Sequence, residues 1–285
     1  MTTRRSFIKT TAGALGAATL LSRFPIALEA APGRKPRPFG FQTWTVRDAL
    51  AEDLSGTLKK LAAMGYEETE FCSPHGYTGT PFEKFRSLSA AELRAIIADS
   101  GLRCESAHFQ MAELRDNLDH GIEWALGMGL TQMICSSFWL AKDATLDDYR
   151  RSCDELNAIG KKIKAAGMQA GFHNHHMEFE KRDGTLIYDA LLERLDPAAV
   201  KMQFQVAVVN IGYKAADYFR AHPGRFISAH LADWSSAEDK QVPIGKGVVD
   251  WKDFFAAAET GGVKNVFVEM DPATFPESAE FLKTM

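Results

Sequence analysis

Short β-rich runs alternate with longer helical patterns along almost the whole chain, and this alternation restricts the fold more than any other feature. Two of the helical segments, residues 54–65 and 89–101, end at glycine, a common helix stop. Eight such units over roughly 250 residues predict an α/β fold, a closed parallel (β/α)8 TIM barrel. The predicted strands are Phe39–Trp44, Tyr66–Cys72, Leu102–Phe109, Thr131–Phe138, Met168–His175, Val200–Val209, Arg225–Asp233 and Asn265–Asp271.

A doubly wound open sheet is the main alternative. No GxGxxG motif follows the first predicted strand, so the sequence gives no support for a dinucleotide site. The four cysteines are far apart and have no CxxC spacing, which excludes a zinc ribbon or a disulfide scaffold and indicates small buried residues. The chain stops at Met285, soon after the eighth strand, so either the last helix is short or the sequence stops before its end.

The first 31 residues read as an export signal. The segment from Thr3 to Lys9 contains Arg4 and Arg5 followed by a large apolar residue and a lysine, which resembles the twin-arginine signal. The apolar run that follows is short and rich in Gly and Ala, unlike a membrane span. We therefore expect a signal peptide at 1–31, a linker at 32–38, a barrel at 39–285, recognition by the twin-arginine export machinery, and a periplasmic or otherwise exported protein.

The net charge argues against nucleic acid as a partner. The chain has a formal charge of −4, and removal of residues 1–31 takes away four basic residues and one acidic residue, which leaves −7. A negative surface does not suit a phosphate backbone.

Polar residues recur near the carboxyl ends of the predicted strands, on the face that strand alternation turns away from the helices. Each of them alone could be a satisfied strand cap. Left unpaired in the interior, each would cost about 1–3 kcal/mol, so the convergence of several on one end of a barrel indicates a site, and that end is where barrel chemistry occurs. The candidates are Gln42, Glu70, His108, His173, His175, Gln205, His230 and Glu269.

The stretch GFHNHHMEFE is the densest of these signals, because it places three of the eight histidines within four positions. Strand alternation sends His173 and His175 to one side and His176 to the other. Asn174 shares the side of His176 and is expected to secure the loop. His175 is expected to contact substrate or to act as an acid or base near neutral pH.

The chain from Phe39 to its end resembles the xylose-isomerase-like barrels, the sugar phosphate isomerase/epimerase group that also contains the family-2 AP endonucleases. The motifs that carry the resemblance are FGFQTWTVRD, the H-x-x-D strand in PGRFISAHLADW, and the G-x-G loop and closing strand in VPIGKGVVDWKDFFAAAETGGVKNVFVEMD. The resemblance implies a barrel that binds one divalent ion at its mouth and removes a proton next to a sugar carbonyl.

In that group the ion is held by Glu, Asp, His and Glu on strands five to eight. His230 and Glu269 match two of these positions, whereas His173 and Gln205 occupy the other two. The resemblance therefore implies His173, Gln205, His230 and Glu269 as metal ligands. With one carboxylate, this set favours a transition metal (Zn²⁺, Mn²⁺, Fe²⁺ or Co²⁺) over Mg²⁺ or Ca²⁺, and it should bind more weakly as pH falls.

The two positions at which this chain differs from the group's metal ligands determine the chemistry that we expect. Glu269 is the candidate base, His175 the candidate partner, and Gln42, Glu70, His108 and Lys246 are expected to bind substrate. The second carboxylate base of the group is replaced by His173, so an asymmetric isomerisation, epimerisation, elimination or hydration is favoured over a two-base epimerisation. Because phosphorylated sugars are scarce outside the cytoplasm, the expected substrate is an unphosphorylated sugar or keto-sugar.

Two alternatives belong to other classes. A non-catalytic carbohydrate-binding barrel with a degenerate metal site would retain no isomerisation or elimination activity. An AP-endonuclease-like nuclease would need further His and Asp ligands and a basic face, which the charge and the export signal disfavour. The sequence leaves the sugar, the reaction direction, the metal and the oligomeric state open.

Overall fold

The computed structural model describes residues 37–285, and within them eight parallel strands close into a barrel in the order β1-β12-β9-β8-β5-β4-β3-β2. The fold predicted from strand–helix alternation is confirmed. The expected signal peptide, at 1–31, lies outside the described residues. The barrel strands are β1 (Gly40–Gln42), β2 (Glu68–Cys72), β3 (Arg103–Phe109), β4 (Gln132–Cys135), β5 (Gln169–His173), β8 (Val200–Gln205), β9 (Phe226–Leu231) and β12 (Asn265–Val268).

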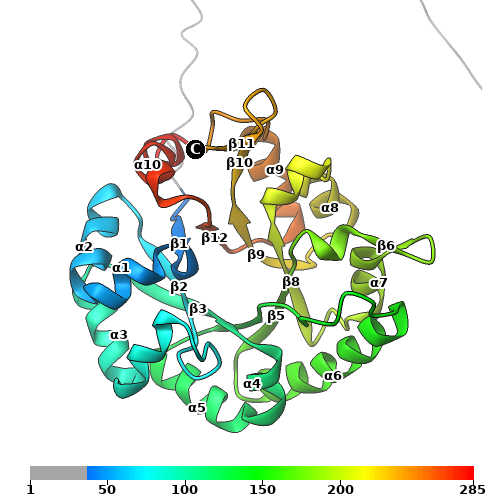
Figure 1. Ribbon diagram of the computed structural model, residues 1–285, viewed down its shortest axis with the longest axis horizontal. Coiled ribbons are helices and arrows are strands. Elements are labelled where there is room, and N and C mark those ends of the chain that lie inside the picture. The colour runs from blue at the N-terminus through cyan, green and yellow to red at the C-terminus, as the bar shows by residue number, and fades with distance from the viewer. Residues whose placement is uncertain (1–36) are drawn as a thin grey trace, which may run out of the picture. The chain divides into compact units, whose positions relative to one another are not determined.

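The helices form a ring outside the strands, as the view along the barrel shows (Figure 1). None of the helices in residues 37–285 is long and apolar enough to cross a membrane. They are α1 (Arg47–Glu52), α2 (Leu54–Met64), α3 (Ala90–Asp99), α4 (Met111–Asp116), α5 (Leu118–Met128), α6 (Leu146–Ala165), α7 (Ile187–Arg194), α8 (Ala215–Ala221), α9 (Trp251–Gly261) and α10 (Phe275–Leu282).

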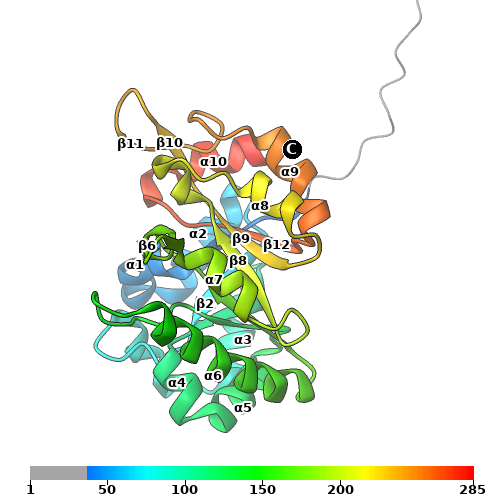
Figure 2. The ribbon, with the colours of Figure 1, turned by 90° about the vertical axis from the view of Figure 1, so that its right-hand side faces the viewer.

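Short elements decorate the loops that follow the strands. The antiparallel pairs are β6 (Lys181–Arg182) with β7 (Thr185–Leu186), and β10 (Asp233–Ser235) with β11 (Lys240–Val242). The side view shows the β10–β11 hairpin at one end of the barrel (Figure 2). The 3-10 turns are η1 (Thr43–Val46), η2 (Pro81–Ser87), η3 (Met177–Phe179), η4 (Val206–Ile211) and η5 (Pro272–Thr274).

Every barrel strand is shorter than its predicted run, and most of the difference is at the carboxyl end. The run predicted to reach Val209 stops at Gln205, where the chain turns into η4, and the run predicted to reach His175 stops at His173. β-branched and aromatic residues continue past the strand ends because the loops are themselves buried there. Propensity alone therefore overestimates strand length.

The strand alternation predicted for the core is confirmed. Met202, Phe204 and Ala229 are completely buried beneath the helices, and Phe267 faces inward with its ring 6.2 Å from the ring of His230. Gly40 leaves room for Phe267, because a Cβ at that position would lie 2.7 Å from its ring. The barrel interior is thus packed with side chains, and the polar cluster lies above Phe267.

The helix ends follow local rules. The N-cap hydroxyl of Ser89 starts α3 through a capping box with Glu92, and Thr145 does the same for α6 with Asp148. Gly65 ends α2 in the left-handed region, as the glycine stop predicted. The four cysteines are free and three of them are buried, which confirms their interpretation as small core residues.

Candidate active site

Three histidines meet at the carboxyl end of the barrel from three different strands. His173 ends β5, whereas His108 and His230 are the second-last residues of β3 and β9, and all three are buried. One nitrogen from each lies within 4.8 Å of the others. The ring centroids of His173 and His230 are 4.3 Å apart, and those of His108 and His230 are 5.1 Å apart.

His230 is held between two carboxylates. Its Nδ1 lies 2.8 Å from Oε2 of Glu269, and its Nε2 lies 2.5 Å from Oε2 of Glu70. Burial alone would lower the pKa of His230, but Glu269 and Glu70 raise it to about 9. In the absence of a bound ion, His230 is therefore a cation at neutral pH, shared between the two acids.

Glu70 lies beneath this histidine and does not face the cavity. It is completely buried, and its Oε1 accepts from Ser106 Oγ at 2.6 Å and from Gln203 Nε2 at 2.7 Å. Burial alone would raise the pKa of Glu70, but His108 and His230 hold it well below its usual range. The sequence predicts that Glu70 binds substrate. Because its oxygens are already bonded to protein groups, its structural position is that of a support for His230.

Glu269 is the carboxylate that reaches the cavity. Its Oε2 receives hydrogen bonds from His230 and from Gln205 Nε2 at 2.6 Å, whereas its Oε1 has no hydrogen bond to any residue in 37–285. Burial would raise the pKa of Glu269, but the contact with His230 lowers it. Glu269 is therefore an anion with one oxygen available to a ligand.

His173 differs from its neighbours because neither ring nitrogen finds a hydrogen-bond partner within residues 37–285. Burial lowers its pKa well below the usual range, and His230 and His175 add to this effect. A neutral, buried imidazole without a partner costs free energy unless something binds it. An imidazole in this state also meets the requirement for a metal ligand, which must be deprotonated.

The residues present fit a transition metal ion. Neutral His173 offers a free nitrogen, His108 and His230 approach it closely, and Glu269 adds an oxygen donor. Imidazole donors suit Zn²⁺, Mn²⁺, Fe²⁺ or Co²⁺ better than Mg²⁺. The sequence predicted three of these four donors but assigned His108 to the substrate, and the geometry adds it to the candidate ligands.

Gln205, the fourth ligand predicted from the sequence, is engaged otherwise. Its Oε1 accepts from Ala207 N at 3.2 Å, which starts η4, and its Nε2 donates to Glu269. As oriented, Gln205 positions Glu269 and has no free oxygen to give to a metal. Asn174 secures the same region by accepting from the backbone N–H of Gln205 at 3.1 Å, as predicted for this residue.

His175 contacts the ring of His173 at a centroid distance of 4.8 Å, so the two lie together as strand alternation predicted. Burial lowers the pKa of His175 to about 4, against the opposing effect of Glu269. The imidazole is therefore neutral at pH 7, the form that can accept a proton or a hydrogen bond. His176, expected on the other side, is exposed and pairs with Asn210 at 2.8 Å, but it lines the same cavity as His175 and Glu269 because the chain has left the strand at His173.

Of the residues predicted to contact substrate, Lys246 lies away from the histidine cluster, and Gln42 already bonds other protein groups. Lys246 is exposed and lines a separate hollow between α2 and α10. Gln42 is buried, and its Oε1 accepts from Trp44 N at 2.5 Å while its Nε2 lies 3.6 Å from the Cys72 sulfur. Gln42 therefore shapes the turn that presents Trp44, and Lys246 does not line the cavity that contains Glu269.

Sequence reasoning missed two groups. Gln203 bridges His108 Nε2 at 2.7 Å and Glu70, and strand alternation had placed it on the inner face without marking it as a site residue. Glu178 is buried beside the loop and accepts from the backbone N–H of His175 at 2.7 Å. Burial raises the pKa of Glu178 to about 7. Its position three residues after His175 gave no signal, because the contact depends on the fold of the loop.

The cavity above the cluster has a volume of about 450 Å³. Glu269 and His175 line it together with Trp44, Arg47 and Asp271. Its size falls in the range of pockets that bind small organic molecules. It therefore gives the free oxygen of Glu269 access to a ligand.

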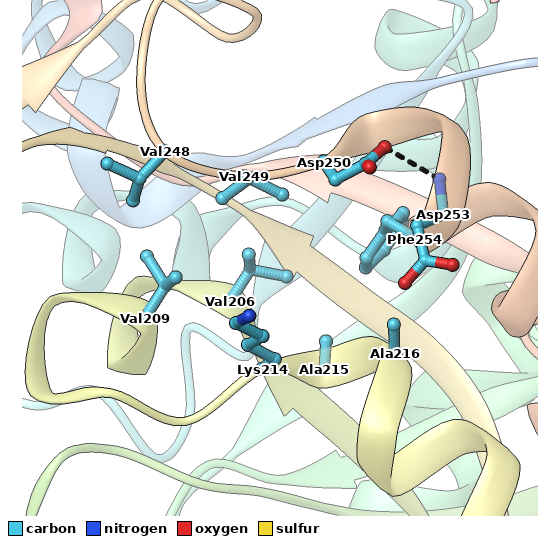
Figure 3. A pocket seen from close by; sticks show the side chains of 10 residues that line it. All are labelled: Val206, Val209, Lys214, Ala215, Ala216, Val248, Val249, Asp250, Asp253 and Phe254. Carbon is cyan, nitrogen blue, oxygen red and sulfur yellow. Dashed lines mark hydrogen bonds between the residues drawn. The ribbon is translucent and has the colours of Figure 1, made fainter.

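A second cavity, of about 170 Å³, lies between η4, α8 and the start of α9 (Figure 3). Four of its ten lining residues are valines, and its two carboxylates are occupied. Asp250 caps α9 by accepting from Asp253 N at 3.0 Å, and Asp253 pairs with Arg220. The 450 Å³ cavity is lined by Glu269, which is hydrogen-bonded to His230, whereas none of the residues that line this second cavity is hydrogen-bonded to the histidine cluster, so we do not assign the reaction to it.

The comparisons with known proteins agree with the fold. The model of the xylose isomerase-like TIM barrel family matches residues 58–285. A sugar phosphate isomerase/epimerase from Parabacteroides distasonis is similar at a TM-score of 0.74 and 21% identity, over 89% of this chain and 96% of that chain. No curated protein gives a significant match.

Two further solved structures illustrate the range of these relatives. An AP endonuclease of family 2 from Brucella melitensis has a TM-score of 0.64 at 15% identity, over 86% of this chain and 98% of that chain. A D-allulose 3-epimerase from Methylomonas sp. has a TM-score of 0.61 at 14% identity, over 88% of this chain and 98% of that chain. At these identities the likeness is one of fold.

Proposed function

This chain belongs to the xylose isomerase-like TIM barrel family, and we propose that it is an enzyme that removes a proton next to the carbonyl of an unphosphorylated sugar or keto-sugar. The observation that carries the proposal is Glu269, an anion with one free oxygen facing a cavity, beside a buried histidine cluster. Isomerisation, epimerisation and elimination all begin with this proton transfer.

Each residue would have a separate task. Glu269 accepts the proton through its free oxygen while Gln205 and His230 hold its other oxygen. Glu70 keeps His230 in place from below. Neutral His175 faces the same cavity and would bond a substrate hydroxyl. A divalent transition metal held by His108, His173, His230 and the Oε2 oxygen of Glu269 would polarise the substrate carbonyl, which leaves Oε1 of Glu269 to accept the proton.

The cavity does not favour a phosphorylated substrate. Arg47 is the only Lys or Arg that lines it, and its guanidinium lies over the Trp44 ring, 4.5 Å from the ring centroid. Glu269 and Asp271 contribute negative charge to the same walls. Phosphate sites usually combine several cations with free backbone N–H groups. The twin-arginine-like motif at Arg4 and Arg5 supports an exported enzyme acting on unphosphorylated sugars.

A nuclease is a weaker alternative. Within residues 37–285, one group of three metal-competent side chains is present, which does not extend to a multi-metal cluster. The negative net charge also disfavours a nucleic-acid partner.

The direct test is hydrogen exchange at carbon. The metal-loaded mature protein is incubated with keto-sugars in D₂O, and NMR follows deuterium appearing next to the carbonyl. We expect exchange with the wild-type protein, and a loss of at least about 100-fold in Glu269→Gln, because the amide cannot accept the proton. Wild-type protein without exchange on any keto-sugar, while it still binds sugar, would support the non-catalytic binding barrel instead.

Two variants of buried glutamates on β2 distinguish the specific support that Glu70 gives His230 from a general effect of removing a buried charge. Glu70 and Glu68 lie two residues apart on β2 and both are buried, but Glu68 bonds Arg103 and Asn265 at the other end of the barrel. We expect Glu70→Gln to lower the exchange rate and the metal affinity by about 10–100-fold, as is typical for partners of metal ligands. Glu68→Gln should leave both nearly unchanged.

A further inference from the structure

Large exposed apolar side chains gather around the mouth of the barrel. Of the five in residues 37–285, only Leu126, on α5, lies elsewhere. The others follow barrel strands at their carboxyl ends: Trp44, Trp139, Ile211 and Val248. Of these four, Trp44 lines the cavity that contains Glu269 and Trp139 contacts His175 in its wall, so these two aromatic side chains are candidates for binding a ligand there.

Trp139 is the most exposed of these side chains, at 53%, and its backbone is strained. Its φ is +49°, in the left-handed region. The other two non-glycine residues there, Asp183 and Asp239, have short polar side chains that tolerate this conformation. For a bulky aromatic residue the conformation is unfavourable, and such strain persists mainly at functional sites.

The neighbours of Trp139 hold this conformation. Phe138 is buried with its ring 4.6 Å from that of Phe172 on β5, and the backbone N–H of Trp139 donates to Ser137 Oγ at 3.2 Å. The indole contacts the ring of His175 at a centroid distance of 5.0 Å and an angle of 49°. The loop therefore presents a large aromatic surface to solvent beside a residue that lines the catalytic cavity.

Trp44, which lines the cavity itself, has a different environment. Its ring stacks on Phe82 at 6.3 Å and carries the Arg47 guanidinium at 4.5 Å. Both contacts hold the Trp44 ring in place as part of the cavity wall. Among its ring contacts in residues 37–285, Trp139 has only the tilted contact with His175, so its indole is available to a ligand.

We propose that Trp139 is a stacking platform for a second ring of the substrate, so that the enzyme acts on glycosides whose reacting sugar carries a keto group and not on free monosaccharides. This inference rests on the proposed function. The reacting sugar lies over Glu269 and His175, and the ring joined to it by the glycosidic bond, a second sugar or an aromatic group, lies flat on the indole. Both kinds of ring present an apolar face, which is what an exposed indole binds.

Binding of unreactive glycosides tests this without chemistry. Calorimetry on the mature Glu269→Gln protein compares glucose and methyl β-glucoside with cellobiose and phenyl β-glucoside. We expect a preference of up to about tenfold for at least one of the two-ring ligands, the size of one aromatic stacking contact. When Trp139→Ala is added to the Glu269→Gln protein, the preference for two-ring ligands should disappear. The affinity for methyl β-glucoside should stay the same. Cellobiose and phenyl β-glucoside distinguish a sugar from an aromatic second ring.

Controls separate the platform from general damage. Leu126→Ala removes an equally exposed apolar side chain on α5 and should leave the preference intact. Trp139→Gly should raise the melting temperature by relieving the strain while it abolishes the preference, a combination that a purely structural role would not produce. Equal binding of all four ligands, or equal losses for all of them in Trp139→Ala, would overturn the proposal. Deuterium exchange in wild-type protein tests the proposed function separately.

Discussion

Glu113, on α4, is a buried acid outside the reaction centre. Its Oε1 accepts from Ser73 Oγ at 2.5 Å, and its Oε2 has no partner within the described part of the chain. Burial is the main cause that raises its pKa to about 7, from 4.5. The folded protein thus holds a proton that the unfolded chain releases between these two values.

The raised pKa of Glu113 determines whether the free energy of unfolding rises or falls with pH. A carboxyl group with a raised pKa in the folded state stabilises most below pH 4.5 and loses that contribution as pH rises to about 7. We expect a loss of about 3 kcal/mol over this window from Glu113. In Glu113→Gln this part of the pH dependence of the unfolding free energy should vanish, as measured by urea unfolding at pH 4.5, 6 and 8. An unchanged slope would show that Glu113 is not the source. The exposed Glu123→Gln is the control and should keep the wild-type slope.

At the scale of elements, Asp233 organises the loop between β11 and α9. It receives five hydrogen bonds, from the backbone N–H groups of Trp234, Gly245, Gly247 and Val249 and from the indole of Trp251. These contacts span 18 residues of sequence. A single carboxylate therefore fixes a segment that has little regular structure of its own.

Replacing this acceptor should loosen the loop and leave the barrel intact. In Asp233→Asn, one oxygen becomes an amide NH₂ that cannot accept, and the N–H groups facing it lose their partner. We expect destabilisation of about 1–3 kcal/mol, with faster hydrogen exchange confined to residues 245–249. Asp250→Asn is the matched control, because Asn caps a helix as well as Asp does. Faster exchange throughout the barrel strands would contradict the assignment of Asp233 to the loop alone.

At the scale of the whole molecule, metal binding should couple to the stability of the barrel. The candidate ligands come from β3, β5, β9 and the segment after β12, so an ion held by them connects distant parts of the chain. At a free metal concentration of 100 times Kd, the expected gain is about 2.7 kcal/mol. Calorimetric scans with Zn²⁺ or Mn²⁺ and after chelation measure this gain as an increase in Tm.

His173→Ala is the informative variant for this prediction. Neither ring nitrogen of His173 has a hydrogen-bond partner within residues 37–285, so the substitution breaks no hydrogen bond there. The variant should therefore fold without metal and lose the metal-dependent increase in Tm. An increase of wild-type size in His173→Ala would exclude this histidine as a ligand.

The sequence by itself determined the barrel. Strand–helix alternation, glycine stops and capping residues act over a few neighbouring residues, and each is visible in the chain. The residues that face the barrel interior could be predicted as well, because side chains alternate along a strand with a fixed period of two. Strand ends were less accurate, since apolar residues in buried loops such as η4 look like strand.

The tertiary structure alone decided what each polar residue does. Glu70 and Glu269 both lie near carboxyl ends of strands, and the sequence could not tell that one would be buried beneath His230 while the other faced the cavity. The same holds for His173 without a partner and for Trp139 beside His175. These differences arise from contacts between strands and loops far apart in sequence, where burial and neighbouring charges set the protonation state and the access of each group.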